Sequence, residues 1–213
     1  MGEKKLVDLT INEFLNKTSS LEPTPGGGSV AALNGALATS LIIMVSEGTI
    51  SKKGFEDYIS DLKSISTKAL ELKTKLQEKI DEDSLAYNSV VEAFKLPKKT
   101  DEEKKKRSEE IQKSFLKAAV VPLEVANLCL ETLILSIKIA TIGKEDALSD
   151  SLVAGLNAIC GCQGAIENVR INLKNLKESK EKESINKKLF EIEKSLSEYC
   201  KEFYNISKQK ITL

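Results

Sequence analysis

The stretch that decides the fold is Ser29-Val-Ala-Ala-Leu-Asn-Gly-Ala-Leu-Ala-Thr-Ser-Leu-Ile-Ile-Met44, which follows the loop Leu21-Glu-Pro-Thr-Pro-Gly-Gly-Gly28. Its residues are small or apolar on every face, which predicts a helix that is buried all round. A second segment, from about Ala147 to Leu176, is also rich in Gly and Ala, which let helix backbones approach closely. Segments that bury so little area must lie among longer helices or against a partner subunit. We therefore expect a homodimer, the commonest symmetric oligomer.

Long amphipathic helices are predicted around these segments. A stripe of residues at steps of three and four indicates one long helix, with at most one break, that Pro97 ends. The stripe consists of Phe55, Ile59, Leu62, Ser66, Ala69, Leu72, Leu76, Ile80, Asp83, Tyr87, Val90 and Phe94. A last helix is predicted from the same spacing between Leu189 and Phe203.

Two helix starts are marked by capping boxes, Thr10 with Glu13 and Thr100 with Glu103. The second box opens a helix that ends near Gly143, and Pro122 predicts a kink in it. No repeat or linker divides the chain. We therefore expect one all-α domain over residues 1–213, a helical bundle with long amphipathic helices around central helices of small residues.

The composition excludes several classes of chemistry. The 213 residues include no His, so a catalytic triad built on imidazole, a His-ligated metal and a His pH switch are ruled out. The counts of 32 Lys+Arg and 32 Asp+Glu argue against a general binder of nucleic acid. The four cysteines, at 129, 160, 162 and 200, form no CxxC pair, and we expect them to be small apolar fillers and no metal to bind.

The location of the protein is inferred from the same composition. The N-terminus continues into polar sequence rather than an apolar signal region. The longest uncharged stretch, between Glu22 and Glu47, has a solidly apolar part shorter than the roughly 20 residues that a membrane span needs. We expect a soluble cytoplasmic protein that does not enter a membrane.

The first candidate site is Pro25-Gly26-Gly27-Gly28-Ser29. Three consecutive glycines cost backbone entropy on folding, so a function or a tight geometry is expected to require them. They precede a helix, whose free N–H groups and dipole favour an anion. A flexible helix entry, or room for a crossing helix, explains them equally well.

The second candidate is Asp83, which lies on the stripe that should face the core. A carboxylate there must be paired, hydrogen-bonded or used, because burying it bare is costly. A cap or a salt bridge on a rotated helix is the alternative, helped by the neighbouring Asp81 and Glu82.

Four further residues are weaker candidates. Arg170 lies in a helix with little other charge and would suit a carboxylate or a phosphate, although a structural salt bridge explains it as well. Asp150, with Ser149, could equally be an N-cap. Lys95 could be an acid or base or a partner of a helix dipole, and Tyr87 could orient a ligand or fill the core.

Five blocks resemble one known family in sequence and in order. The run Pro23-Thr-Pro-Gly-Gly-Gly-Ser-Val-Ala-Ala-Leu33 is similar to the signature of the cyclodeaminase domain of formiminotransferase-cyclodeaminase, a family that includes stand-alone methenyltetrahydrofolate cyclohydrolases. The other blocks are Asp83-Ser-Leu-Ala-Tyr87 with Ala93-Phe-Lys-Leu-Pro-Lys98, Ala118-Ala-Val-Val-Pro-Leu123, Ser149-Asp150 with Val153-Ala154, and Asn168-Val-Arg-Ile-Asn-Leu173. The resemblance covers nearly the whole chain.

The resemblance implies an all-helical, dimeric enzyme that acts on the one-carbon unit of tetrahydrofolate. The formiminotransferase part is not seen in these 213 residues, which favours a free-standing methenyltetrahydrofolate cyclohydrolase over a formimidoyltetrahydrofolate cyclodeaminase. Asp83 is then expected to move the proton, and Lys95 to donate one or to clamp the folate tail. No permanently bound cofactor is implied, because the tetrahydrofolate derivative is the substrate.

The resemblance also implies binding roles. Gly26, Gly27, Gly28 and Ser29 would present N–H groups to the pterin carbonyl or to a glutamate carboxylate. Arg170 would suit a folate carboxylate, or would orient Asp83 or Asp150. A folate-binding module without activity, or a bundle whose glycine loop contacts a protein partner, stays open as an alternative.

Overall fold

The computed structural model describes residues 4–211, and in this range the chain is all helical, with no strand. Six α-helices are joined by short connections, two of which contain a single turn of 3-10 helix, and a third such turn precedes α1. The α-helices are α1 (Ile11–Thr18), α2 (Gly27–Ile50), α3 (Ile59–Lys95), α4 (Asp101–Ile142), α5 (Leu148–Leu173) and α6 (Lys180–Ile211). The 3-10 turns are η1 (Leu6–Asp8), η2 (Glu56–Tyr58) and η3 (Glu145–Ala147). The predicted fold class is confirmed.

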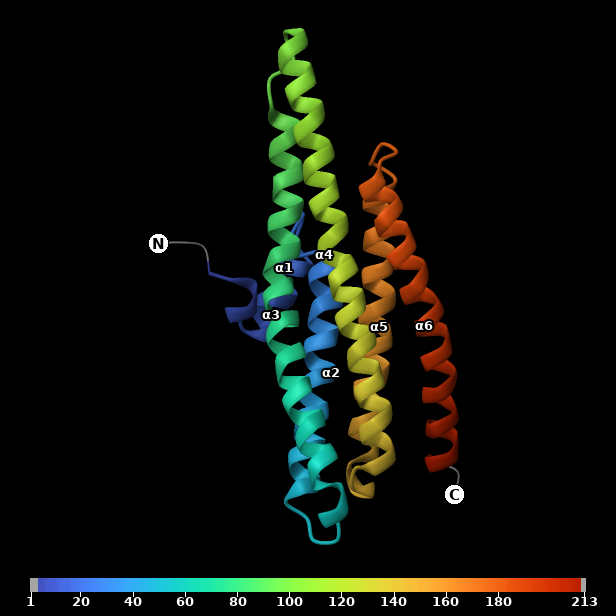
Figure 1. Cartoon of the computed structure of the whole chain (residues 1–213). Helices are drawn as coiled ribbons and strands as arrows, with labels where there is room; N and C mark the ends of the chain where they lie inside the picture. The colour runs from blue at the N-terminus through green and yellow to red at the C-terminus, as the bar shows by residue number, and fades with distance from the viewer. Residues whose placement is uncertain (1–3, 212–213) are drawn as a thin grey trace.

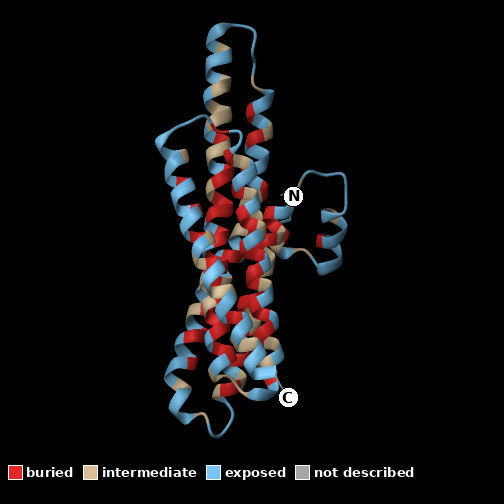
Figure 2. Cartoon of the chain, turned by 90° about the vertical axis from the view of Figure 1, so that its right-hand side faces the viewer, coloured by how far each residue is buried: buried red, intermediate tan, exposed pale blue. Residues whose placement is uncertain are grey.

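Helices α2, α3, α4 and α5 lie side by side along one axis, and α6 packs on α4 and α5 (Figure 1). The small N-terminal helix α1 lies across the side of the bundle. The last part of α3 and the first part of α4 extend beyond the other helices as a two-helix projection, which we call the α3–α4 arm (residues 85–115; Figures 1 and 2). The main core is shared by the helices below the arm.

Both predicted capping boxes are present. The Thr10 hydroxyl accepts from the Glu13 N–H at 3.2 Å, and the Glu13 carboxylate accepts from the Thr10 N–H at 2.6 Å. Thr100 and Glu103 make the same pair of bonds, at 3.2 and 3.1 Å. Each box satisfies N–H groups that the first helical turn leaves unpaired, so α1 and α4 begin at the next residue. Helix α4 continues through Pro122 to Ile142.

Glycine allows α2 and α5 to cross closely. A Cβ on Gly161 of α5 would lie 2.8 Å from the carbonyl oxygen of Ala31 in α2, and a Cβ on Gly35 of α2 would lie 2.7 Å from the Cys129 sulfur of α4. Separations this short are not tolerated by real side chains, so these two positions require glycine. The small residues therefore do what their sequence predicts: they let two backbones meet.

Helix α2 is not buried all round within one chain, contrary to the prediction. Leu37 and Met44 are 48% and 49% exposed, and Val153 and Leu156 of α5 are similarly exposed. The reason is that α3, α4 and α5 pack on one side of α2, while its other side has no long helix against it.

The burial of the stripe on α3 also differs along the length of the helix. Leu62, Leu72 and Leu76 are fully buried, as predicted, but Tyr87 and Phe94 are 44% and 49% exposed. In the arm, Ala86, Val90 and Ala93 are buried instead. Helix α2 begins beside the level of Asp83, so beyond that level α3 has only α4 to pack against, and a different face of α3 is covered.

The cysteines are all free thiols, and only two of them are apolar fillers. Cys129 and Cys162 are buried, and burial raises the pKa of the Cys162 thiol to about 12. Cys160 is exposed and Cys200 is half-buried, so the prediction was wrong for Cys160.

Two helices are long and apolar enough to cross a membrane by length and composition, α2 and α4. More than half of each apolar window, 56% in α2 and 72% in α4, is buried within the chain. Core helices of soluble proteins have the same properties, so this feature is weak support for a membrane span.

Candidate active site

The site begins at the N-terminus of α2. The chain enters this helix through a cis Thr24–Pro25 peptide bond, and the N-cap residue Gly26 has no side chain to pair with the first N–H groups. The first bond of the helix runs from the Val30 N–H to the Gly26 carbonyl, at 3.1 Å. The N–H groups of the first turn are therefore left to other partners, as at any uncapped helix start.

The carboxylate of Asp83 lies against this turn. A Cβ on Gly28 would overlap with the Asp83 carboxylate, so the carboxylate can approach only because residue 28 is glycine. The Ser29 hydroxyl lies 3.3 Å from Asp83 Oδ2. A helix N-terminus favours an anion. The anion next to the glycine block is thus the protein's own Asp83.

Ser29 is fully buried, and its hydroxyl connects the start of α2 to groups of α3 around Asp83. Its hydroxyl donates to the carbonyl oxygen of Ile80 at 2.8 Å and lies 3.2 Å from the Ser84 hydroxyl. Its position suits the orientation of Asp83 better than direct contact with a ligand. Pro25 is buried as well, whereas Gly27 is exposed.

The surroundings of Asp83 shift its proton equilibrium. Burial raises the pKa of the Asp83 carboxyl above its ordinary value of 3.8, while hydrogen bonding from the Ser29 side chain and backbone works in the opposite direction. Burial is the larger effect because it removes water from the charged form. A partly buried carboxyl with a raised pKa is suited to take up and release a proton.

Helix α5 supplies a wall that sequence reasoning did not single out. The Asn168 carboxamide lies next to Gly27, with its Nδ2 3.4 Å from the position that a Gly27 Cβ would take. The Nδ2 of Asn172 donates to the carbonyl oxygens of Ala118 and Asn168, at 2.8 and 2.9 Å. The signal for these residues was two amides one turn apart on an otherwise apolar helix face.

Two of the other candidates lie farther along α3. Tyr87 is one turn beyond Asp83 on the same face and is close to half exposed. Lys95, the last residue of α3, is about 18 Å farther along the helix axis than Asp83. Its ammonium pairs with Glu92 at 2.7 Å and is largely exposed. Proton transfer needs hydrogen-bond distance or one bridging water, so Lys95 is too far from Asp83 to act on the same atoms.

Asp150 and Arg170 are not brought to Asp83 within one chain. Asp150 lies in the first turn of α5, about 27 Å along the axis from Asn168. The N-cap of α5 is Ala147 and no side chain caps it, so the N-cap reading of Ser149 and Asp150 is wrong. Arg170 forms ion pairs with Glu167 and, at 2.7 Å, with Glu193 of α6, so it faces α6.

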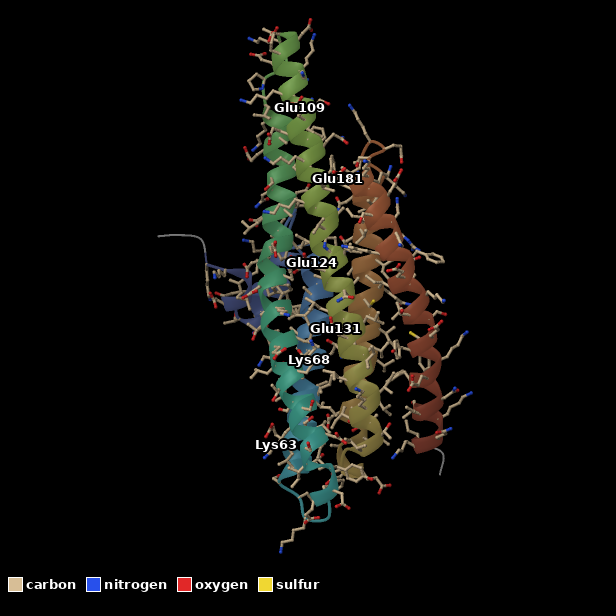
Figure 3. The ribbon with its side chains drawn as sticks, in the orientation of Figure 1. Lys63, Lys68, Glu109, Glu124, Glu131 and Glu181 are labelled. Carbon is tan, nitrogen blue, oxygen red and sulfur yellow. The ribbon has the colours of Figure 1, made fainter. Side chains whose placement is uncertain are left out.

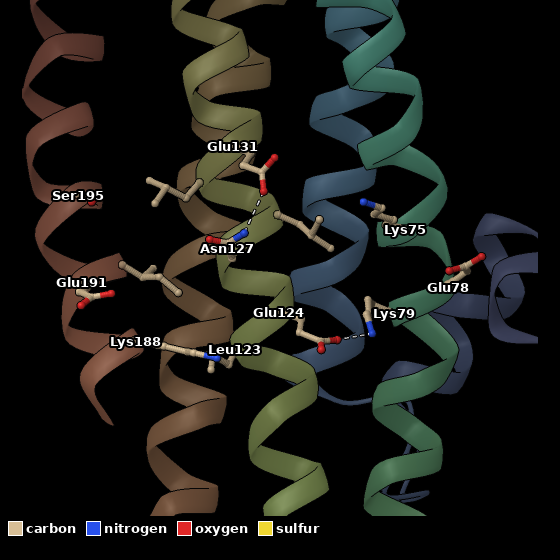
Figure 4. Close-up of a pocket in the computed structure, with 13 residues that line it drawn as sticks. Lys75, Glu78, Lys79, Leu123, Glu124, Asn127, Glu131, Lys188, Glu191 and Ser195 are labelled. Carbon is tan, nitrogen blue, oxygen red and sulfur yellow. Dashed lines mark hydrogen bonds and ion pairs between the residues drawn. The ribbon is translucent and has the colours of Figure 1, made fainter. Parts of the chain in front are cut away.

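Several charged side chains elsewhere form ion pairs on the surface. A cavity of about 680 Å³ lies between α3, α4 and α6, away from Asp83 (Figure 4). Its wall contains Lys79, which pairs with Glu124 and Glu82 at 2.5 Å. Lys68 and Glu131 form another pair farther along the same two helices, at 3.0 Å (Figure 3). Within residues 4–211, no three His, Cys, Asp or Glu side chains are grouped so that they could hold a metal ion.

Fold and site together define a class of protein: an all-helical bundle in which an acid with a raised pKa rests on a glycine-rich helix start. The family model named Formiminotransferase-cyclodeaminase matches residues 10–191. The chain belongs to this family.

Relatives in the family carry two names. The chain is 40% identical to a methenyltetrahydrofolate cyclohydrolase of Methylorubrum extorquens, over 78% of this chain and 80% of that protein. It is 32% identical to the formimidoyltransferase-cyclodeaminase of Mus musculus over 82% of this chain, but it spans only about a third of that protein, 32%.

A solved structure has the same fold. The crystal structure of formiminotetrahydrofolate cyclodeaminase from Thermotoga maritima superposes with a TM-score of 0.87, over 98% of this chain and 100% of that one, at 26% identity.

Proposed function

We propose that the chain is a folate one-carbon enzyme that hydrolyses 5,10-methenyltetrahydrofolate to 10-formyltetrahydrofolate. The observation that carries the proposal is the partly buried Asp83, held over Gly28 with a raised pKa. The choice of reaction is supported by the 40% identity to a methenyltetrahydrofolate cyclohydrolase over most of both proteins.

The hydrolysis needs one group that accepts a proton and then returns it. Water adds to the cationic carbon between N5 and N10 while the Asp83 carboxylate takes one of its protons, which gives a neutral carbinol. The Asp83 acid then protonates N5, and the bond between N5 and the carbon breaks. The remaining hydroxyl proton leaves to solvent as the formyl C=O forms on N10. Asp83 ends in its starting form, and one proton is released overall.

The position of Asp83 serves both halves of this cycle. Its negative charge stabilises the cationic bridge of the bound substrate, and its raised pKa makes the protonated form a usable acid for N5. Because the chain contains no His, a carboxylate or an amine has to perform the exchange that imidazole performs in many enzymes, and we assign it to Asp83.

The second candidate is cyclodeamination of 5-formiminotetrahydrofolate. N10 would attack the formimino carbon, and the tetrahedral adduct would expel ammonia, so the same acid would move the protons. The likeness to the Thermotoga maritima cyclodeaminase over almost the whole chain favours it. A folate-binding module that lacks activity is the third candidate.

A spectroscopic assay separates the three. Purified protein is mixed with 5,10-methenyltetrahydrofolate and the loss of its chromophore is followed. Accelerated loss is expected for the cyclohydrolase. Appearance of the same chromophore with ammonia from 5-formiminotetrahydrofolate would identify the cyclodeaminase. Binding without either change would contradict both activities.

The predicted binding residues fit this reaction to different extents. We propose that Gly26, Gly27 and Gly28 contact the pterin through their backbones and that Tyr87 packs over it. Lys95 is placed to clamp the carboxylate of the extended folate tail rather than to donate a proton. Arg170 and Asp150 could reach a substrate at Asp83 only from a second subunit.

We also propose a soluble, cytoplasmic homodimer. The outer face of α2 and α5, with Leu37, Met44, Val153 and Leu156, exposes apolar side chains and bears no charge on α2 from Gly27 to Ser46. Such a face is typical of a subunit interface. Light scattering should give the mass of a dimer, and Met44→Glu should give a monomer.

A further inference from the structure

We propose that Asn168 reads the lactam edge of the pterin ring together with the backbone N–H of Gly27. This assignment rests on the proposed folate function and names the groups that select the ring. Of the α5 side chains in the described residues, only that of Asn168 comes within 4 Å of the position that a Gly27 Cβ would take.

The orientation of the Asn168 carboxamide is fixed by one hydrogen bond. Its side chain donates to the carbonyl oxygen of Gly164, at 2.8 Å, and only the Nδ2 end of a carboxamide can donate. The Oδ1 end is therefore the free acceptor. Among the described residues, no hydrogen bond to this oxygen is present, and Asn168 is only half-buried.

Gly27 supplies the complementary donor. Its N–H belongs to the first turn of α2, where no carbonyl of the helix can accept it, and the N-cap Gly26 offers no side chain. Asn168 Oδ1 lies 3.9 Å from the position that a Gly27 Cβ would take, so a backbone N–H donor and a carboxamide acceptor lie close together. A lactam presents the opposite pair, with C4=O as acceptor and N3–H as donor. The two edges match.

This pose also brings the reacting atoms to the acid. In a pterin, O4 and N5 point to the same side of the ring system, one from each ring. If Gly27 binds O4, the neighbouring residue Gly28 faces N5, and Asp83 lies directly against Gly28. Recognition of the ring and delivery of a proton to N5 then follow from two successive residues of one helix turn.

The test compares two ligands in the same protein. Calorimetry measures the Kd of tetrahydrofolate and of its 4-amino-4-deoxy analogue, in which the lactam is replaced by an amino group and a bare ring nitrogen. Wild type should prefer tetrahydrofolate by roughly 30-fold or more, because the analogue leaves both protein groups unpaired. Asn168→Leu should reduce this preference about tenfold, mainly by weakening tetrahydrofolate.

Two further variants serve as controls for the effect of Asn168→Leu on ligand preference. Asn157→Leu removes a carboxamide that makes the same bond to the preceding turn of α5, from its Nδ2 to the Val153 carbonyl at 2.9 Å, and it should keep the full preference. Asn168→Ala leaves no bulk against Gly27 and should act like Asn168→Leu. A ratio of two Kd values in one preparation does not depend on the folded fraction.

The results that would contradict this inference alone differ from those that would also contradict the proposed function. If wild type turns over methenyltetrahydrofolate but binds both ligands equally, or if Asn168→Leu and Asn168→Ala keep the preference, the role of Asn168 is wrong and the proposed function stands. If wild type binds neither ligand and turns over no folate, the proposed function and this inference are both wrong.

Discussion

The two halves of α3 carry the same stripe at helical spacing but have different neighbours. In the half below Asp83, the stripe that includes Leu72 and Leu76 is enclosed by α2 and α4 and joins the main core. Beyond Asp83, α3 packs on α4, around a small separate cluster of Ala86, Val90, Ala118 and Val121 that lies at the base of the arm. The difference arises where α2 begins. Asp83 stands at that junction, where an acid is neither enclosed nor fully in water.

The junction therefore explains why a carboxylate can work there. Deeper in the bundle a lone carboxylate would be too costly, and farther out on the arm it would keep its ordinary pKa. The end of one helix thus produces the partial burial that raises the Asp83 pKa.

The largest effect is expected from substitution of Gly28, the residue that lets Asp83 lie against the start of α2. In Gly28→Ala, the new Cβ would overlap with the Asp83 carboxylate and displace it. Turnover of methenyltetrahydrofolate should fall about a thousandfold, the range that a misplaced proton carrier costs. Gly48→Ala is the matched control, since it lies about 30 Å farther along the same helix and its Cβ would meet only the flexible end of the Lys144 side chain, at 3.3 Å, so it should stay within about threefold of wild type. Equal losses of turnover in both variants would contradict the role of Gly28 in positioning Asp83.

The second prediction compares the stability of the two halves. Leu76→Ala should lower the free energy of unfolding by about 3 kcal/mol, because it leaves a cavity in the main core. Phe94→Ala should cost about 1 kcal/mol, since this ring is half exposed and packs edge-on against Phe115. Urea unfolding measures both. A larger loss for Phe94→Ala would show that the arm carries the stability.

A smaller effect is expected at the end of the arm. Lys95→Ala should raise KM for the folate about fivefold and leave kcat unchanged, because an exposed ammonium can assist binding only modestly. Lys104→Ala, a lysine paired with Asp101 on the same arm, should change neither. A fall in kcat without a change in KM would instead support Lys95 as a proton donor.

The smallest effect concerns stability and pH. The Asp83 pKa is higher in the folded chain than its ordinary 3.8, so between these two values the folded state binds more protons than the unfolded state. Stability contributed by this group is present at low pH and is lost as pH rises through the raised pKa. Asp83→Asn should therefore be at least as stable as wild type at pH 7, and its advantage should vanish below pH 3.8. Thermal unfolding of wild type and Asp83→Asn at pH 7 and below pH 3.8 measures this difference in stability. A variant that is less stable than wild type at pH 7 would contradict the effect of burial on Asp83.

Local sequence signals predicted much of the fold. The two capping boxes and Pro97 marked helix ends correctly because their effects act over a few residues. The glycine block and Asp83 were both chosen as sites, and the structure places them in contact.

The remaining features depend on distances that no local pattern contains. A stripe at helical spacing states that one face is covered, but not where the covering helix ends, so Tyr87 and Phe94 were placed in the core incorrectly. Asp150 and Arg170 lie on the same helix as Asn168, yet their position along the helix and their direction separate them from Asp83. Asn168 was missed because its relevance comes from Gly27, far away in the sequence.

The most direct test of the central claim is the turnover of 5,10-methenyltetrahydrofolate by Asp83→Asn, measured beside Glu82→Gln, the adjacent acid that pairs with Lys79. Circular dichroism of both variants should match wild type, and so should their binding of tetrahydrofolate, which lacks the cationic bridge. The account predicts that Asp83→Asn loses at least about a thousandfold in kcat while Glu82→Gln stays within about threefold. Near-normal turnover by Asp83→Asn would remove this residue from the chemistry and contradict the account.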